Sequence, residues 1–175
     1  MVGIRLARVN DRRGIQRLLD QLEYPGSESF LETKLERMVK DPEEVLLVWE
    51  EEGPGAEGGV ADRGEGGAED GGGEEAEGGG EGGAGGRILG LLSLHFIPQI
   101  AVEGDFARIS YFAVDEGVRN GGIGRMMEAH ATKLAREKGC RLIEVHCHER
   151  RERAHEFYFR QGYVESPKYL IKRLL

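Results

Sequence analysis

A glycine-rich turn with a basic residue at either end is the stretch of this chain best suited to chemistry. It runs Arg119-Asn120-Gly121-Gly122-Ile123-Gly124-Arg125, between an apolar segment typical of a strand and an amphipathic segment typical of a helix. Glycine lets the backbone approach a ligand closely because it has no Cβ. The free amides at the start of the following helix favour an anion. The turn therefore predicts a seat for a phosphate or pyrophosphate.

Two common phosphate-binding motifs do not fit this turn. A P-loop needs Lys-Ser or Lys-Thr after its glycines, and no such pair follows Gly124. A dinucleotide fingerprint that starts at Gly122 would place Met127 where its third glycine belongs. That fingerprint also needs repeated parallel strand–helix–strand units, which the order of the predicted elements does not provide.

The elements around the turn follow the order β-α-α-β-β-β-α-β-α-β. This order predicts one α+β domain over residues 1–175, with a mixed, mostly antiparallel sheet. The expected strands are residues 3–8, 44–50, 87–97, 104–115, 141–147, 162–164 and 168–172. The expected helices start at Asn10-Asp11, at Ser27 as an N-cap, at the glycine turn and at Arg151.

Residues 53–86 form a segment rich in glycine and glutamate between two strong strand candidates. The segment lacks the apolar surface needed to offset the entropy of ordering it, so we expect a disordered loop insertion. It is either a silent insertion or an acidic regulatory or partner-binding segment. Its charges account for the whole formal net charge of −8, so the remainder is neutral. We therefore expect no nucleic-acid partner.

No apolar run has the length of a membrane helix or of a secretory signal, which predicts a cytoplasmic protein without a membrane partner. Cys140 and Cys147 stand at opposite ends of one expected strand, too far apart to form a disulfide with each other. His146 and His148 lack a third and a fourth ligand at the usual spacing, so we expect no metal site.

Two segments of the chain resemble the signatures of the GNAT superfamily of N-acetyltransferases. The turn from Arg119 to Gly124 matches its Gln/Arg-x-x-Gly-x-Gly/Ala motif, and residues 154–163 resemble its Ala-x-x-Phe-Tyr-x-x-x-Gly-Phe/Tyr segment. The resemblance covers the whole chain except residues 53–86. It implies the GNAT fold, in which the fourth and fifth strands splay apart and about four helices flank the sheet. It also implies transfer of the acetyl group of acetyl-CoA to a primary amine, by direct attack in a ternary complex.

The resemblance assigns residues to the cofactor. The end of the fourth strand, at Phe112, Ala113 and Val114, would bind the pantetheine arm through its backbone. Arg151 stands where relatives often have an asparagine that contacts the cofactor. The pyrophosphate would lie on Arg119, Asn120, Gly121, Gly122, Ile123, Gly124 and Arg125.

The catalytic groups follow from the same resemblance. Tyr158 aligns with a tyrosine that acts as general acid toward the departing thiolate, although an aromatic side chain that only packs in the helix fits the pattern too. Because side chains alternate along a strand, Glu144, His146 and His148 are expected on one strand face. For the general base, the resemblance leaves His146, Glu144, a water molecule or another group as candidates.

The amine acceptor stays open, because family members diverge in the segments that would bind it. A small amine (an aminoglycoside, a polyamine or an amino acid) fits, and so does the N-terminus or a lysine of a protein. A homodimer is compatible with the resemblance. The alternative function is a degenerate GNAT domain that binds acyl-CoA as a sensor or scaffold without turnover.

Overall fold

A computed structural model describes residues 3–51, 86–166 and 170–174 of the chain. All of the segment predicted to be disordered except Gly86 lies outside these residues. The elements are β1 (Gly3–Leu6), η1 (Val9–Asp11), α1 (Arg12–Gln21), α2 (Leu31–Met38), β2 (Glu44–Glu51), β3 (Arg87–Ile97), β4 (Asp105–Val114), η2 (Glu116–Val118), α3 (Ile123–Glu137), β5 (Cys140–Val145) and α4 (Glu152–Arg160).

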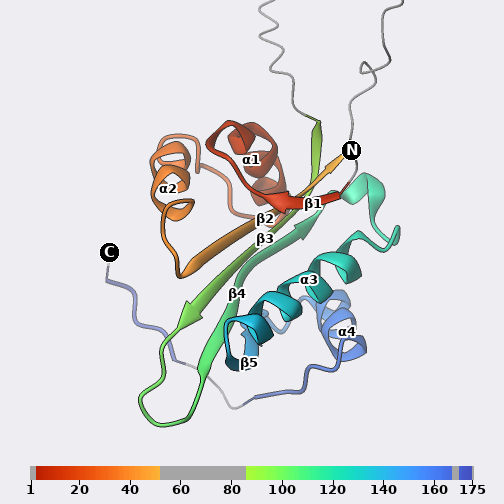
Figure 1. The fold of residues 1–175 in the computed structure, drawn as a ribbon. Helices are drawn as coiled ribbons and strands as arrows, with labels where there is room; N and C mark the ends of the chain where they lie inside the picture. The colour runs from red at the N-terminus through yellow and green to blue at the C-terminus, as the bar shows by residue number, and fades with distance from the viewer. Residues whose placement is uncertain (1–2, 52–85, 167–169, 175) are drawn as a thin grey trace, which may run out of the picture.

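One five-stranded sheet, in the order β1-β2-β3-β4-β5, forms the centre of the fold (Figure 1). The first four strands pair antiparallel, and β5 pairs parallel to β4. The parallel pair requires a crossover, which α3 supplies. The predicted mixed, mostly antiparallel sheet of an α+β fold is confirmed.

Helices cover both faces of the sheet, with α1 and α2 on one side and α3 on the other (Figure 1). The alternation of side chains along β2 serves both layers. Leu46 and Val48 pack with buried leucines of α1 and α2, whereas Leu47 packs with Met127 and Ala131 of α3. In the described ranges no helix is long and apolar enough to cross a lipid bilayer.

Strand β2 pairs with β3 along its whole length, from Glu44 opposite His95 to Glu51 opposite Arg87. One register shift interrupts them, between Trp49 and Glu50. At the far end, the amide of Gly86 donates a 2.9 Å hydrogen bond to the Glu50 carboxylate. The two strands that flank residues 52–85 are therefore direct neighbours, as expected for an overgrown hairpin.

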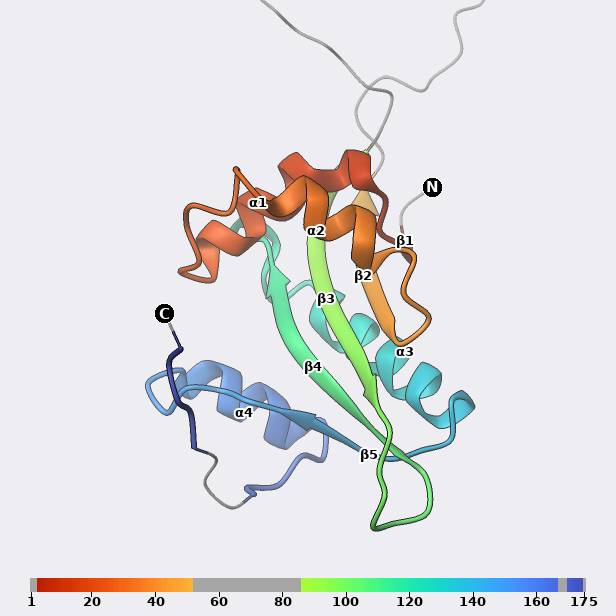
Figure 2. The ribbon, with the colours of Figure 1, turned by 90° about the vertical axis from the view of Figure 1, so that its left-hand side faces the viewer.

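Strands β4 and β5 separate part-way along β4. Their pairing ends at Ile109 opposite Val145, and β4 continues to Val114 without a partner on that side. Ser110 stands at a register shift against β3, where an extra residue bends the strand. Figure 2 shows β4 running up the sheet while β5 swings away toward α4. The predicted splay is thus present, and among the described residues it leaves the β5-facing backbone groups of residues 110–114 without a strand partner.

Three local predictions are wrong. Strand β5 ends at Val145 rather than at Cys147, because no neighbouring strand accompanies it further. Ser27 does not cap α2, which begins four residues later; its hydroxyl donates instead to Oε1 of Gln16 on α1. Residues 162–164 form no strand, and neither do residues 170–172, the described end of the last predicted strand.

Candidate active site

The glycine turn joins β4 to α3 through two residues with left-handed backbone. Asn120 has φ 71° and Gly122 has φ 84°. Asparagine tolerates this region better than most residues, and glycine has no Cβ that would oppose it. Gly122 caps α3, which starts at Ile123. The sequence predicted both the place of this turn and the start of the helix that follows it.

The turn presents a row of free amides. The first backbone hydrogen bond of α3 runs from Met126 to the carbonyl of Gly122. The amides of residues 122–125 donate to no other described residue, whereas the amide of Gly121 is used by the carbonyl of Val118. Free amides at the positive end of a 15-residue helix are suited to binding an anion.

Asp115 connects this turn to neighbouring elements through its buried carboxylate. Its carboxylate, in a residue that is 3% exposed, accepts a 3.0 Å hydrogen bond from the amide of Gly117. It also lies 3.1 Å from Nη2 of Arg17 and 3.4 Å from Nη2 of Arg87. Burial alone would raise the pKa of Asp115, but the amide of Gly117 and the two guanidinium groups outweigh it and lower the pKa. A charged, buried carboxylate therefore connects the turn to α1 and β3.

Strand β4, the turn and α4 meet at Gly124. A Cβ on this residue would lie 3.4 Å from the ring of Phe157 and 3.7 Å from a methyl group of Val114. The ring of Phe157 contacts the ring of Phe112 edge to face at 5.7 Å. The end of β4 that no longer pairs with β5 thus lies directly beside the turn and α4.

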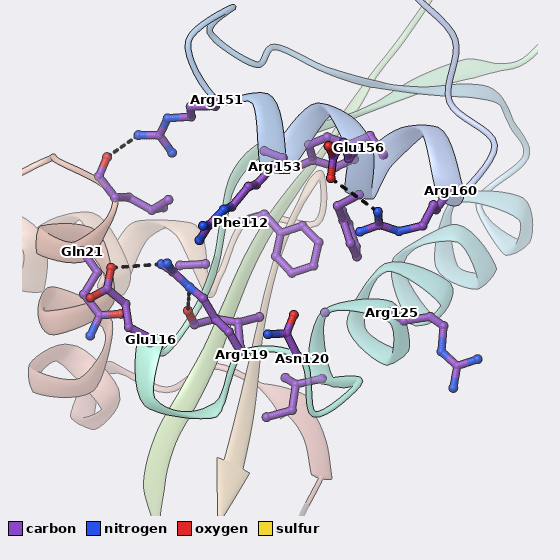
Figure 3. Close-up of a pocket in the computed structure, with 18 of the residues that line it drawn as sticks. Gln21, Phe112, Glu116, Arg119, Asn120, Arg125, Arg151, Arg153, Glu156 and Arg160 are labelled. Carbon is purple, nitrogen blue, oxygen red and sulfur yellow. Dashed lines mark hydrogen bonds and ion pairs between the residues drawn. The ribbon is translucent and has the colours of Figure 1, made fainter.

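A cleft of about 1300 Å³ occupies the space between these elements (Figure 3). Its walls are the end of β4, the turn, the start of α3, α4 and the end of α1. The cleft combines apolar groups at its β4 end with amides and charged groups around the turn.

Six arginines line the cleft: Arg119, Arg125, Arg150, Arg151, Arg153 and Arg160. Four of them have protein partners. Arg119 pairs with Glu116 at 3.2 Å, Arg160 with Glu156 at 3.7 Å, Arg150 with Glu23, and Arg151 donates to the carbonyl of Leu22. Among the described residues, the side chains of Arg125 and Arg153 have no hydrogen-bond or ion-pair partner. Four glutamates also line the walls, so the arginines outnumber the acidic side chains of the cleft. This excess of positive charge favours an anionic ligand.

Tyr158 lines the cleft from α4 and is 9% exposed. Its ring packs between those of Phe157 and Tyr163, each with its centroid at 5.3 Å. Burial raises the pKa of this phenol well above its ordinary value, Cys147 and Glu128 add to that effect, and Arg151 opposes it. The phenol therefore stays protonated at neutral pH and holds a proton at the wall of the cleft.

The sequence model of a known family identifies the family of this chain. The sequence model of the Acetyltransferase (GNAT) family matches residues 75–163, which include the turn, β5, α4 and Tyr163. The chain is a member of the GNAT acetyltransferase family. An aminoalkylphosphonate N-acetyltransferase of Salmonella typhimurium is 32% identical over 81 residues. That match covers 46% of this chain and 53% of the relative, so it spans about half of the relative's length.

Solved structures share the fold of this GNAT chain. A transcriptional regulator from Bacillus halodurans superimposes with a TM-score of 0.73 at 20% identity, over 99% of this chain and 100% of the other. A glucosamine-6-phosphate N-acetyltransferase from Arabidopsis thaliana gives 0.70 at 17% identity, over 99% of both chains. Together with the splay, these likenesses confirm the predicted GNAT fold.

The cleft contains most of the residues that the GNAT resemblance assigned to the cofactor. Gly121 is absent from the lining residues described for the cleft, since its amide points to Val118. Of the three candidate catalytic residues, the cleft lining contains only Tyr158. The predicted cofactor residues that line it are Phe112, Ala113, Val114, Arg119, Asn120, Gly122, Ile123, Gly124, Arg125 and Arg151.

The candidate bases Glu144 and His146 lie outside the lining of the cleft. Glu144, on β5, is paired with Arg108 of β4 through contacts of 2.6 and 2.5 Å. His146 is exposed and follows the end of β5, and so does His148. The three side chains were expected on one face of a strand. Only Glu144 lies on β5, so they do not share such a face. In the described parts of the chain, no three His, Cys, Asp or Glu side chains cluster as metal ligands would.

Several lining residues escaped the sequence analysis of this GNAT chain. Arg153, Glu156, Phe157 and Arg160 form one face of α4 at the spacing i, i+3, i+4 and i+7, and this face lines the cleft. That spacing was readable in the sequence. Gln21 and Leu22 carried no signal, because only the packing of α1 against the sheet brings them to the cleft.

Proposed function

We propose that this chain transfers the acetyl group of acetyl-CoA to a primary amine in a ternary complex. In this reaction the amine nitrogen forms a bond to the acetyl carbon and the carbon–sulfur bond breaks, giving an amide and the thiol of CoA. One observation carries the proposal above all. The row of free amides, the end of β4 that β5 leaves uncovered, and Tyr158 all line the same cleft.

The residues of the cleft fit CoA. The amides of residues 122–125 and the unpaired guanidinium of Arg125 suit a pyrophosphate, because they place donors and positive charge at the end of a helix. The backbone of Phe112 and Val114, at the splay, suits the amides of a pantetheine arm. When bound, acetyl-CoA would supply a thioester whose carbonyl carbon an amine can attack.

Tyr158 would act as the general acid. Its pKa, raised by burial, keeps the phenol protonated, so the hydroxyl can stabilise the leaving thiolate by donating a hydrogen bond to the sulfur as the proton is handed over. Attack also requires a neutral amine, so a base must remove a proton from the acceptor. Glu144, His146 and water stay the candidates, with Glu144 held in place by Arg108.

The acceptor is a primary amine. The Salmonella relative is named for aminoalkylphosphonates, amines that also carry an acidic group. Arginine is in excess around the cleft, which supports including acidic amines among the acceptors to be tested. A suitable panel contains an aminoalkylphosphonate, an amino acid, a polyamine, an aminoglycoside and a peptide with a free N-terminus.

The proposal is tested by measuring release of CoA thiol from acetyl-CoA with each amine of the panel. We expect at least one amine to be acetylated. Tyr158→Phe should lower kcat by about 100-fold or more while CoA still binds with wild-type affinity. The hydroxyl of Tyr158 has no hydrogen-bond partner among the described residues, so its removal should leave the folded structure intact. CoA binding without thiol release on any amine would instead assign a non-catalytic acyl-CoA-binding domain.

The base is identified by two further variants in the same assay, Glu144→Gln and His146→Gln. Loss of a general base should lower kcat by about 100-fold at neutral pH without changing the affinity for CoA. If neither variant loses more than a few-fold, water takes the proton. Glu144→Gln has Arg108→Met as its control, since both variants break the same ion pair.

A further inference from the structure

A buried carboxylate on α3 lies outside the roles described so far. Glu128 is 6% exposed, and no lysine, arginine or histidine forms an ion pair with it among the described residues. A buried carboxylate is costly unless hydrogen bonds compensate it. Two hydroxyl groups do so: Oγ1 of Thr132 donates at 2.8 Å and the phenol of Tyr163 donates at 3.2 Å, both to Oε1.

Tyr163 links this carboxylate to the wall of the cleft. The chain reverses after α4 at Gly162, whose φ of 90° is readily adopted only by glycine. This reversal lets the amide of Tyr163 donate a 3.1 Å hydrogen bond to the carbonyl of Tyr158. The rings of the two tyrosines also pack together, with their centroids 5.3 Å apart and their planes at 60°. Tyr163 therefore contacts Tyr158 through both backbone and ring, and Glu128 through its hydroxyl.

We propose that Glu128 is a positioning residue, which through the hydroxyl of Tyr163 holds the ring of Tyr158 in the orientation that acetyl transfer uses. The inference rests on the proposed function in one respect, because it needs Tyr158 to act in the transfer. Tyr158 sits on α4, the last helix of the described residues. Glu128 belongs to α3, the helix that also carries the row of free amides. The contact thus fixes the acid and the anion seat relative to the same helix.

The electrostatics around Tyr158 agree with this geometry. The groups that act on it are Cys147 after β5, Arg151 before α4, and Glu128 on α3, with Tyr163 against its ring. Burial is the main cause of its raised pKa, and Glu128 adds to it. Burial and Glu128 likewise raise the pKa of Tyr163, so that phenol remains a hydrogen-bond donor.

The test compares Tyr163→Phe and Glu128→Gln with Thr132→Val, the matched control that removes the other donor to the same oxygen of Glu128. A displaced catalytic group costs rate, so we expect Tyr163→Phe to lower kcat by about 10-fold and Glu128→Gln, whose neutral amide oxygen is a weaker acceptor, by about threefold. The KM for acetyl-CoA should change by less than about twofold, because the amides of the turn are untouched. Thr132→Val should lower the melting temperature by about 2 to 4 °C, as the loss of Tyr163's hydroxyl does, with kcat unchanged.

A double-mutant cycle separates positioning from general destabilisation. In a Tyr158→Phe background, Tyr163→Phe should cause no further loss of kcat, because the group that it positions is already gone. An equal loss in both backgrounds overturns the inference, and so does a loss of kcat in Thr132→Val equal to that in Tyr163→Phe. Wild-type kcat in Tyr158→Phe would refute the role of Tyr158 and the inference together. A loss in Tyr158→Phe with wild-type kcat in Tyr163→Phe and Glu128→Gln would refute the inference alone. Should Glu128→Gln fail to fold, Tyr163→Phe carries the test.

Discussion

Nη2 of Arg151 donates a 2.6 Å hydrogen bond to the carbonyl oxygen of Leu22, and this contact joins the start of α4 to the end of α1 beside the cleft. Its neighbour Arg150 reaches the same connection, but through an exposed ion pair with Glu23. The two arginines therefore make equivalent connections in very different surroundings.

This difference predicts unequal effects on stability. Arg151→Met leaves a partly buried carbonyl without its donor and should lower the free energy of unfolding by about 1 to 2 kcal/mol. Arg150→Met should lower it by less than about 0.5 kcal/mol, because an exposed ion pair contributes little. Urea denaturation of both variants checks the prediction. Equal losses would mean that the contact with Leu22 has no special weight.

The two ends of α3 offer a matched pair of glycines. Gly122 and Gly139 have φ values of 84° and 82°, and an added Cβ would meet no atom closer than 3.9 Å at either one. Alanine at each position should cost about 1 kcal/mol of stability through backbone strain alone. Only Gly122→Ala should also weaken CoA binding, by about 10-fold, because the strained turn displaces the amides that would hold the pyrophosphate. Calorimetry with CoA measures both variants, and equal affinities would show that the turn is not the anion seat.

Asp115 gives a third prediction. Asp115→Asn removes the charge that faces Arg17 and Arg87 but keeps an acceptor for the amide of Gly117. Because the carboxylate is buried, we expect a loss of about 2 to 4 kcal/mol, together with weaker CoA binding as the turn loosens. Arg87→Met, the control, removes only a half-exposed partner and should cost less than about 1 kcal/mol. Thermal unfolding and calorimetry test both expectations, and a cost for Arg87→Met as large as that for Asp115→Asn would refute them.

The ion pair between Arg5 and Glu50 predicts a dependence of stability on pH. The hydrogen bond from Arg5 lowers the pKa of Glu50 to about 2, against the effect of burial, and the amide of Gly86 contributes. A carboxylate with a lowered pKa in the folded state stabilises the protein above its unfolded pKa of about 4.3, and that stabilisation is lost as the pH falls toward 2. Allowing for solvent screening at a partly exposed site, the loss should be about 1 to 2 kcal/mol.

Glu50→Gln isolates this contribution. The difference in unfolding free energy between wild type and variant should be largest above pH 5 and should shrink steadily between pH 4 and pH 2. Urea denaturation at several pH values measures it. A difference that stays constant over this range would contradict the assignment of the lowered pKa to Glu50.

Local patterns in the sequence predicted most of the fold and the place of the glycine turn before α3. Gly122 and Asn120 mark the turn because few other residues adopt a left-handed backbone readily, and the apolar spacing of α3 follows directly. The end of β5 was not predictable in the same way. The strand pattern continues through His146 and Cys147, but β4 bends at Ser110, so the pairing between β4 and β5 ends at Val145. Tyr163 belongs to an expected strand and instead turns inward, because Glu128 accepts its hydroxyl.

The cleft shows the same division. The backbone donors of the turn could be found from sequence, since their geometry depends on residues close together in the chain. The positions of Glu23 and Arg150 could not, because their contact joins segments 127 residues apart. The position of Glu144 and His146 outside the lining of the cleft likewise depends on how far β5 swings from β4.

The pairing of Glu51 with Arg87 has a consequence for how this protein can change over time. The chain leaves the sheet at one residue and returns at its immediate neighbour, so the pairing holds Glu51 and Arg87 about 5 Å apart. Lengthening or shortening such a connection adds little closure entropy and leaves the register of β2 and β3 unchanged. This junction is therefore where the gene can gain or lose sequence at least risk to the enzyme. For the same reason it is a natural point at which to graft a fluorescent reporter or an affinity module.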